Sequence, residues 1–325
     1  MRCLVTLVLL CLGSAGMAFE TRVVTDHFDR QVEVPADPQR IVSLDVIGAT
    51  AILADLRVPF IASVASLDTD TSEYYLPAMS ASYGMTLKGD NITPIPIANP
   101  FDIELIASLD PDLILATART YEQVDLLGAV APTVFLNETP HPWEYQEAVA
   151  NAVNQMEAFE RRKQDYEDRV AKIKRYIDLP EGATYTIFEA TEQGLLVREL
   201  FGVNHVAEDL GLVRNPSMQQ IEDDNLFWVQ LLSWEQLPEM EADFVFVPFT
   251  DQGWSNLEDQ LRLLDANIPN WCNFLPACKE GRMIFFSRET TASPTFLHLH
   301  DTLSLITNEA VNRRFTGRNG LPGRE

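Results

Sequence analysis

The sequence contains none of the short motifs that place a catalytic group or a phosphate at a defined point of a fold. It has no Gly-x-Ser-x-Gly elbow, His-Glu-x-x-His helix, Cys-x-x-Cys pair, P-loop or Rossmann Gly-x-Gly-x-x-Gly. Catalysis would therefore need residues distant in the chain, including a base whose pKa is shifted in a cleft. The pattern favours a binding protein over an enzyme. A two-lobed hydrolase or metal chelatase is the alternative from another class.

The N-terminus has the pattern of a secretory signal peptide. Arg2 supplies a positive charge, Leu4–Leu12 is almost wholly apolar, and Gly16-Met17-Ala18 provides small residues before a cleavage point. A transmembrane anchor would need roughly 20 apolar residues, and this run is shorter. Cys11 lacks the small preceding residue of a lipoprotein cleavage site, so lipid anchoring is the less favoured alternative. We expect residues 1–18 to be removed on export.

Export would leave two cysteines, Cys272 and Cys278, separated by a short loop that contains Pro276. In an exported protein such a pair is expected to form a local disulfide. Two thiolates alone do not complete a tetrahedral metal site, and no histidine lies nearby in the sequence. The short loop predicts a stabilisation of roughly 2–3 kcal/mol through the unfolded state.

Two segments, Ile103–Leu115 and Trp234–Phe246, align with one another without a gap. Each has a glutamate near its start, an apolar pair, an acidic turn, and an aspartate before an apolar run. This pattern predicts a short helix that leads directly into a buried strand of a parallel sheet. Two copies of the unit suggest two similar lobes.

Further buried strands are predicted on both sides of the middle of the chain, after an exposed hairpin at 21–34. They are expected at 40–44, 60–65, 113–116 and 133–136, and again at 185–188, 244–247 and 283–286. Strands that alternate with helical patterns predict an α/β fold with two doubly wound parallel sheets.

The segment from Pro142 to Ile177 has no glycine and no internal proline, and its apolar residues recur at three- and four-residue steps. It predicts one amphipathic helix, roughly 50 Å long at 1.5 Å per residue, which would span both lobes. A coiled coil is the alternative. We therefore divide the chain into an N-terminal lobe (19–141), an interlobe helix (142–178) and a C-terminal lobe (179–325).

The chain is strongly acidic, with 24 Lys and Arg against 48 Asp and Glu and a net charge of -24. Nucleic-acid binding depends on basic surface, so the charge argues against it. It also argues against docking on an anionic membrane. The 325 residues are enough for two domains with cores of their own.

The order of several segments resembles bacterial periplasmic binding proteins for ferric siderophores, haem and cobalamin. The resemblance rests on Val32–Pro35, Pro38–Val42, the unit that ends in Pro111–Ile114, the long helix, and Trp271–Met283. It implies two α/β lobes joined by a rigid helix, with a ligand cleft between them and only a small hinge motion. It further implies a monomeric periplasmic receptor without an intrinsic cofactor. The receptor would deliver its ligand to an inner-membrane ABC permease.

The resemblance also implies a role for one glutamate on each lobe, Glu104 and Glu235, which stand at matching positions of the repeated unit. In the family these glutamates contact arginines of the permease. Two rim carboxylates at a fixed separation would orient a basic partner. The alternative is that each glutamate only complements the dipole of its first helical turn.

Ligands of open α/β sheets bind beyond the carboxyl ends of the strands, which directs attention to the loops at those ends. A ferric siderophore, the ligand that the resemblance implies, is bulky and often anionic, so its site needs flat apolar walls and a few cations. The candidate cations are Arg119, Arg198, Arg214 and Arg288, and the candidate walls are Tyr121, Trp143, Trp228 and Trp254, with Tyr74 and Tyr83.

Histidines offer a second, metal-binding possibility, because some relatives supply a Tyr or His to the iron. His205 and His298 are the candidates, and a hydrogen-bonded structural role is the alternative for each. The segment Phe201–His205 departs from a Gly-Ser-containing stretch of siderophore binders, which leaves the ligand class open. We favour a ferric siderophore, with haem or cobalamin as alternatives.

Overall fold

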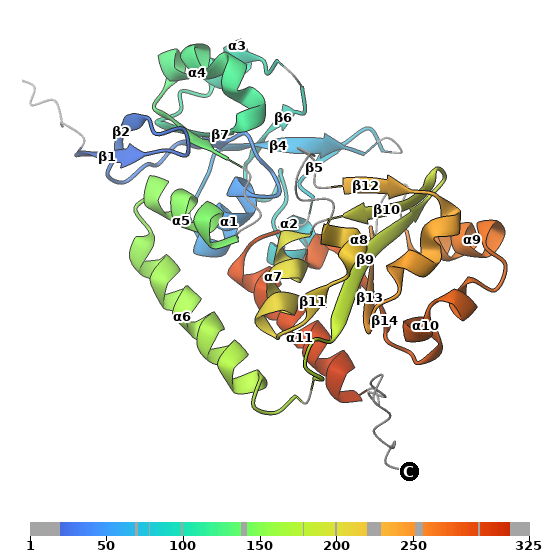
Figure 1. Cartoon of the computed structure of the whole chain (residues 1–325). Helices are drawn as coiled ribbons and strands as arrows, with labels where there is room; N and C mark the ends of the chain where they lie inside the picture. The colour runs from blue at the N-terminus through green and yellow to red at the C-terminus, as the bar shows by residue number, and fades with distance from the viewer. Residues whose placement is uncertain are drawn as a thin grey trace, which may run out of the picture.

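The computed structural model describes residues 20–312, except for 69–70, 78, 99, 138–141, 178, 199, 220–228, 251–255 and 292. Figure 1 shows two α/β lobes, with two helices running along one side of the molecule. The predicted α/β class with two lobes is confirmed. Each lobe contains a six-stranded sheet.

The sheet of the N-terminal lobe has the order β5-β4-β3-β7-β8, and β6 pairs with β4. All neighbours are parallel except the short β5, which is antiparallel to β4. The strands are β3 (Ile41–Ser43), β4 (Ala62–Leu67), β5 (Tyr74–Tyr75), β6 (Thr93–Pro96), β7 (Leu113–Thr117) and β8 (Thr133–Leu136). The predicted strands of this half are thus confirmed.

A hairpin of β1 (Thr21–Thr25) and β2 (Gln31–Pro35) extends this lobe, as the alternating pattern predicted. Its turn packs on β8, where His27 N donates to Phe135 O at 3.1 Å. The helices of the lobe are α1 (Ala49–Leu56), α2 (Met79–Tyr83), α3 (Ile103–Ser108), η1 (Ala118–Gln123) and α4 (Val124–Val130).

The sheet of the C-terminal lobe has the order β12-β10-β9-β13-β14, and β11 pairs with β9. Its strands are β9 (Thr184–Thr191), β10 (Gly194–Arg198), β11 (Val213–Arg214), β12 (Val229–Leu232), β13 (Phe244–Phe249) and β14 (Met283–Ser287). The central strands β9, β13 and β14 are parallel, as predicted, but β10 is antiparallel to both β9 and β12. The expectation of a wholly parallel sheet is therefore wrong for this edge.

A tight turn causes this departure. Gly194 has a φ of 146°, and a Cβ at this position would lie 2.2 Å from Leu232 O. Only glycine accepts both the conformation and the close approach. The chain therefore reverses at once after β9 instead of entering a helix.

The helices of this lobe flank the sheet (Figure 1). They are α7 (Phe201–Asp209), α8 (Pro216–Gln219), η2 (Trp234–Met240), α9 (Leu257–Asn267), η3 (Trp271–Phe274), α10 (Pro276–Lys279), η4 (Arg288–Thr290) and α11 (Phe296–Asn312). The predicted disulfide is present: Cys272 in η3 is bonded to Cys278 in α10. The repeated unit is also confirmed, since α3–β7 and η2–β13 each form a short helix followed by a buried strand.

The predicted single helix over Pro142–Ile177 is two helices, α5 (Pro142–Ala152) and α6 (Met156–Ile173). Between them Asn154 has a φ of 58°, a left-handed conformation that asparagine tolerates better than most residues. Arg22 on the hairpin donates to Ala152 O at 2.7 Å and so satisfies a carbonyl at the end of α5. The chain therefore turns at Asn154 instead of continuing one helix.

A buried carboxylate joins the two lobes behind the sheets. Asp55, in the last turn of α1, lies 2.9 Å from Arg162 of α6 through Oδ2 and Nη1. The same oxygen accepts from Phe296 N, at the start of α11, at 3.1 Å. Burial raises the pKa of Asp55, whereas Arg162 and the amides of Phe296 and Leu297 act in the opposite direction. One side chain of the N-terminal lobe thus caps a helix of the C-terminal lobe.

We predict that Arg162→Ala lowers the free energy of unfolding at pH 7 by about 3 kcal/mol. The change leaves the Asp55 carboxylate buried without its cation, and the loss is at the low end of the range for such pairs because Arg162 is 33% exposed. The pKa of Asp55, already raised in the folded protein, would rise further. A raised carboxyl pKa contributes stability at low pH that is lost as the pH rises through it. The deficit should therefore shrink toward about pH 4.

Urea unfolding of wild type and variant at both pH values measures this difference. Arg161→Ala is the matched control, because Arg161 is 64% exposed and pairs with Glu157 on the same helix. Its effect should stay within about 0.5 kcal/mol. A deficit in Arg162→Ala that does not change with pH would contradict the role of Asp55.

Candidate functional site

Three charged residues meet at the carboxyl edge of the C-terminal sheet, where the sequence predicted ligand-binding loops. Glu189 lies near the end of β9, and Arg288 follows β14. Arg198 ends the antiparallel β10, one residue beyond the Val197–Phe188 pair, so its side chain reaches back toward the carboxyl end of β9. Arg198 Nε lies 2.7 Å from Glu189 Oε1, and Arg288 Nη1 donates to the same oxygen at 3.5 Å. Two of the predicted arginines are thus brought together.

The register of the hairpin explains why Arg198 reaches Glu189. Leu196 pairs with Glu189 across the antiparallel ladder. Arg198 stands two residues further on, so it lies on the same face as Leu196 and diagonally across from Glu189. Sequence analysis did not identify Glu189, because its partners are distant in the chain or depend on this register.

The three side chains are largely withdrawn from solvent: Glu189 is 0% exposed, Arg198 14% and Arg288 22%. Burial lowers the pKa of Arg198, with Glu189 acting to raise it and Arg288 to lower it. The guanidinium groups are therefore close enough to repel one another. Neither arginine Nε–H makes a well-aligned hydrogen bond among the described residues, so the 2.7 Å approach of Arg198 Nε to Glu189 Oε1 is an ion-pair contact.

The predicted cation Arg214 does not belong to this group. It ends β11, which lies beside the first two residues of β9, with Arg214 opposite Tyr185. Four residues separate Tyr185 from Glu189, or roughly 13 Å along a strand. Arg214 instead pairs with Glu208 of α7. The structure thus places Arg214 toward the amino end of the sheet, away from Arg198 and Arg288.

On the N-terminal lobe, Tyr121 of η1 follows β7 at the corresponding carboxyl edge and is 42% exposed. Its ring stacks on Phe28 of the hairpin turn at 4.6 Å between centroids, and both contact Phe135. Sequence analysis missed Phe28, although an aromatic residue in the turn of an exposed hairpin was an available signal. Together these rings form an aromatic surface at the edge of the lobe.

The side chains of three other predicted ligand contacts lie outside the described part of the structure. Arg119 lies in η1, but its side chain is outside the described part of the structure. Trp228 and Trp254 lie in 220–228 and 251–255, outside the described residues.

Trp143 and His205 take part in helix packing. The Trp143 ring on α5 meets His205 of α7 edge-on at 4.8 Å and Tyr166 of α6 at 5.4 Å. Its contact with Phe296 of α11 brings four helices together at one indole. Trp143 is thus partly buried among helices, and His205 lies against aromatic rings with its Nε2 3.3 Å from Asp209 Oδ2.

His298 lies in the packing between the lobes, an environment that favours the structural alternative for this residue. It is fully buried, and its Nε2 is 2.7 Å from Ser82 Oγ of α2. Tyr83, next to Ser82, donates to Thr295 at 2.9 Å, so this pair also connects the lobes. Burial lowers the pKa of His298 to about 4. Within the described ranges, no group of three or more His, Cys, Asp or Glu is arranged to hold a metal.

Glu104 and Glu235 are exposed in the first turns of α3 and η2. Their helices begin at well-formed caps: Asp102 accepts from Leu105 N at 3.0 Å, and Ser233 and Gln236 form a capping box. The described surroundings include no ion pair to either glutamate. Each cap fixes the start of its helix, and the helix start in turn presents an exposed glutamate carboxylate at the surface of its lobe.

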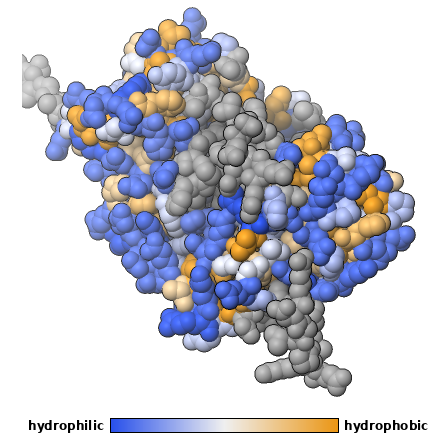
Figure 2. Space-filling view, viewed as in Figure 1, coloured by the Kyte–Doolittle hydropathy of each residue, from blue (hydrophilic) through white to orange (hydrophobic). Residues whose placement is uncertain are grey.

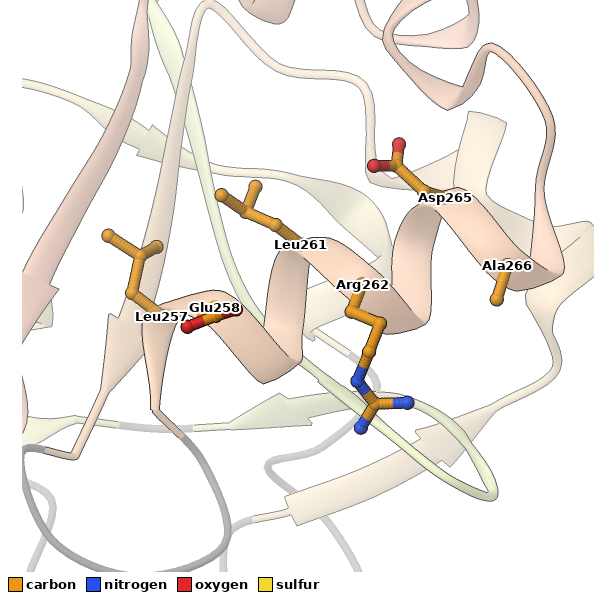
Figure 3. Close-up of a pocket in the computed structure, with 6 residues that line it drawn as sticks. All are labelled: Leu257, Glu258, Leu261, Arg262, Asp265 and Ala266. Carbon is orange, nitrogen blue, oxygen red and sulfur yellow. The ribbon is translucent and has the colours of Figure 1, made fainter.

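A shallow groove runs along α9 and is lined by residues of that helix alone (Figure 3). The groove carries Glu258, Arg262 and Asp265 beside leucine side chains, and Arg262 is already paired with Asp259. Gln260, which anchors α9 to β9 and β13, is on the other side. In a typical ligand site, polar groups from several elements point toward one ligand. Because only α9 lines this groove, it does not have that arrangement.

On the face shown in Figure 2, the described residues are mainly hydrophilic, and apolar residues are scattered singly or in small groups. Among the described helices, none combines the length and the apolar character needed to cross a bilayer.

The two α/β lobes and the helices that pack between them define a two-lobed protein of the binding-protein class. The chain belongs to the periplasmic binding protein family, whose model matches residues 49–289. It is 28% identical over 234 residues, or 70% of this chain and 68% of the relative, to a probable siderophore-binding lipoprotein, YfiY, of Bacillus subtilis.

Solved structures show the same fold. Staphylococcus aureus SirA, complexed with staphyloferrin B, superposes with a TM-score of 0.70 at 22% identity, covering 90% of this chain and 99% of SirA. The FhuD protein of S. pseudintermedius gives a TM-score of 0.69 at 17% identity, with 90% and 98% covered. These proteins share the architecture of two α/β lobes with this chain.

We predict that His298→Gln removes an acid-sensitive step in stability. In wild type the unfolded chain takes up a proton near pH 6.5, whereas the buried imidazole does so only near about pH 4. A depressed histidine pKa means that stability falls as the pH falls between these values, by up to about 3 kcal/mol. Urea unfolding at about pH 7 and about pH 4.5 should show a smaller loss in the variant. Equal losses would show that the imidazole is not held neutral.

Proposed function

We propose that this chain is an exported receptor that captures a ferric siderophore between its lobes and delivers it to an inner-membrane ABC permease. The observation that carries the proposal is the pair Arg198 and Arg288 at the carboxyl edge of the C-terminal sheet. Membership of the periplasmic binding protein family supports the receptor role. The names of the relatives, which include a siderophore-binding lipoprotein and a staphyloferrin B complex, support the ligand class.

The charges of the site favour an anionic chelate. Two guanidinium groups share a single carboxylate, so the cluster of Arg198, Arg288 and Glu189 keeps a positive charge in a chain of net charge -24. Guanidinium donors bind carboxylate and catecholate oxygens in charge-assisted hydrogen bonds. The aromatic surface of Phe28 and Tyr121 provides an apolar wall on the other lobe.

Haem and cobalamin are less well supported as ligands. The packing of both candidate imidazoles, His205 and His298, against neighbouring side chains supports this order of preference. We further propose that residues 1–18 are a cleaved signal peptide, that the receptor acts in the periplasm as a monomer, and that it has no catalytic step.

We predict saturable binding of one iron chelate per chain. Quenching of tryptophan fluorescence by ferric hydroxamate, catecholate and citrate complexes, haem and cobalamin would measure the affinities. Arg198→Gln or Arg288→Gln should weaken the best chelate about tenfold or more, because each removes charge-assisted hydrogen bonds. Arg214→Gln is the matched control and should bind normally, because Arg214 lies on β11 and pairs with Glu208. Failure of every chelate to bind at micromolar concentration would refute the proposal.

We predict that Glu104→Ala combined with Glu235→Ala reduces uptake of the iron chelate by cells about tenfold or more, without changing its affinity. The two exposed carboxylates would orient the receptor on a basic surface of the permease. Glu157→Ala is the control, because Glu157 is an exposed helical glutamate on α6. A loss of chelate affinity in the double variant would place these glutamates in the ligand site and exclude the docking role.

A further inference from the structure

Glu189 is a fully buried carboxylate at the ligand-facing edge of the sheet. Both arginines of the cluster reach its Oε1 atom, Arg198 at 2.7 Å and Arg288 at 3.5 Å. Burying a carboxylate is costly unless cations and hydrogen bonds compensate for lost hydration. The two guanidinium groups provide that compensation. In turn, the carboxylate reduces the repulsion between them.

The position of Arg288 shows where this cluster lies relative to the lobes. The next residue, Glu289, accepts a hydrogen bond through its backbone carbonyl from Ser82 Oγ of α2, at 3.1 Å. The Glu289 carboxylate itself accepts from Ser287 Oγ at 2.8 Å. The cluster is therefore one residue away from a contact with the N-terminal lobe.

Within the cluster of Arg198, Arg288 and Glu189, the negative charge is that of Glu189. With the carboxylate, two arginines leave one net positive charge; without it, they would leave two. Arg198 and Arg288 are only 14% and 22% exposed, so solvent screens this charge less than it would at the surface. A change of one unit charge near a ligand oxygen is worth about a factor of ten or more in affinity at such a site.

We propose that Glu189 sets the charge selectivity of the ligand site, limiting the attraction for anions to that of one net positive charge. The inference rests on the proposed function, because it requires an iron chelate to contact the arginine pair. Glu189 is a specificity-determining residue that acts through Arg198 and Arg288. A purely structural carboxylate would, in contrast, affect all ligands to the same extent.

The test compares Glu189→Gln with wild type for three probes: ferric citrate and a ferric catecholate, which are anionic, and ferrioxamine B, a hydroxamate chelate with a free ammonium group. Glutamine keeps the size and a hydrogen-bond acceptor but removes the charge. The variant should bind the anionic probes about tenfold more tightly, and ferrioxamine B no more tightly than wild type. Circular dichroism and thermal unfolding establish that the variant is folded.

Two further variants isolate the charge. Glu157→Gln makes the same change of net charge beside Arg161, on the exposed face of α6, and should leave all affinities unchanged. Glu189→Gln combined with Arg288→Gln returns the cluster to one net positive charge. This double variant should lose the tightening seen in Glu189→Gln. It also provides a folded alternative if two unbalanced arginines destabilise the single variant.

The outcomes separate the inference from the function on which it rests. If wild type binds no chelate, the proposed function fails. If wild type binds a chelate but folded Glu189→Gln binds the anionic probes equally or more weakly, the selectivity role is overturned. Binding of ferrioxamine B alone by wild type would also overturn it, because the arginine pair would then not contact an anion.

Discussion

The arrangement of the whole molecule depends on one buried carboxylate, Asp55. It belongs to the N-terminal lobe, yet its partners are Arg162 on α6 and the first amide of α11 in the C-terminal lobe. A carboxylate withdrawn from water is stable only if such partners are held in place. Asp55 therefore requires the crossing helix and the last helix to keep fixed positions relative to α1.

The junction between the two lobes is rigid for a different physical reason from the one that the sequence suggested. A single long helix would have acted as a strut between the lobes, but the chain turns at Asn154 and forms α5 and α6. Rigidity instead comes from cross-links: Asp55 with Arg162, Ser82 with His298, and Tyr83 with Thr295. Because these contacts are buried and polar, opening the junction would leave several groups unsatisfied. The lobes are thus expected to move by a small hinge angle.

The sequence predicted those features that depend on local pattern. Apolar runs located the parallel strands, the repeated unit marked one helix–strand pair in each lobe, and the spacing of Cys272 and Cys278 indicated their disulfide. The break at Asn154 was missed because the apolar periodicity continues through it. Its cause is a left-handed residue together with Arg22, which is more than a hundred residues away.

The candidate site was predictable only in part. Beyond the strand ends, an arginine is equally consistent with ligand binding and with surface pairing, and Arg198 and Arg214 could be distinguished only by strand order and register. Trp143 and His298 have side chains suited to ligand or metal contact. In the structure both side chains lie in contacts between helices, and a local sequence pattern does not indicate such contacts. Glu189 gained its significance only from two partners on other elements.

The tight turn at Gly194 has an evolutionary consequence. Side chains alternate between the two faces of the sheet along β10. Arg198 therefore shares the face of Glu189 only in the observed register. Insertion or deletion of one residue in the turn at 192–193 would move Arg198 to the opposite face. A lineage could thereby exchange a charged ligand site for an apolar one without replacing any strand residue. In this fold, the length of one loop decides on which face of the sheet Arg198 lies.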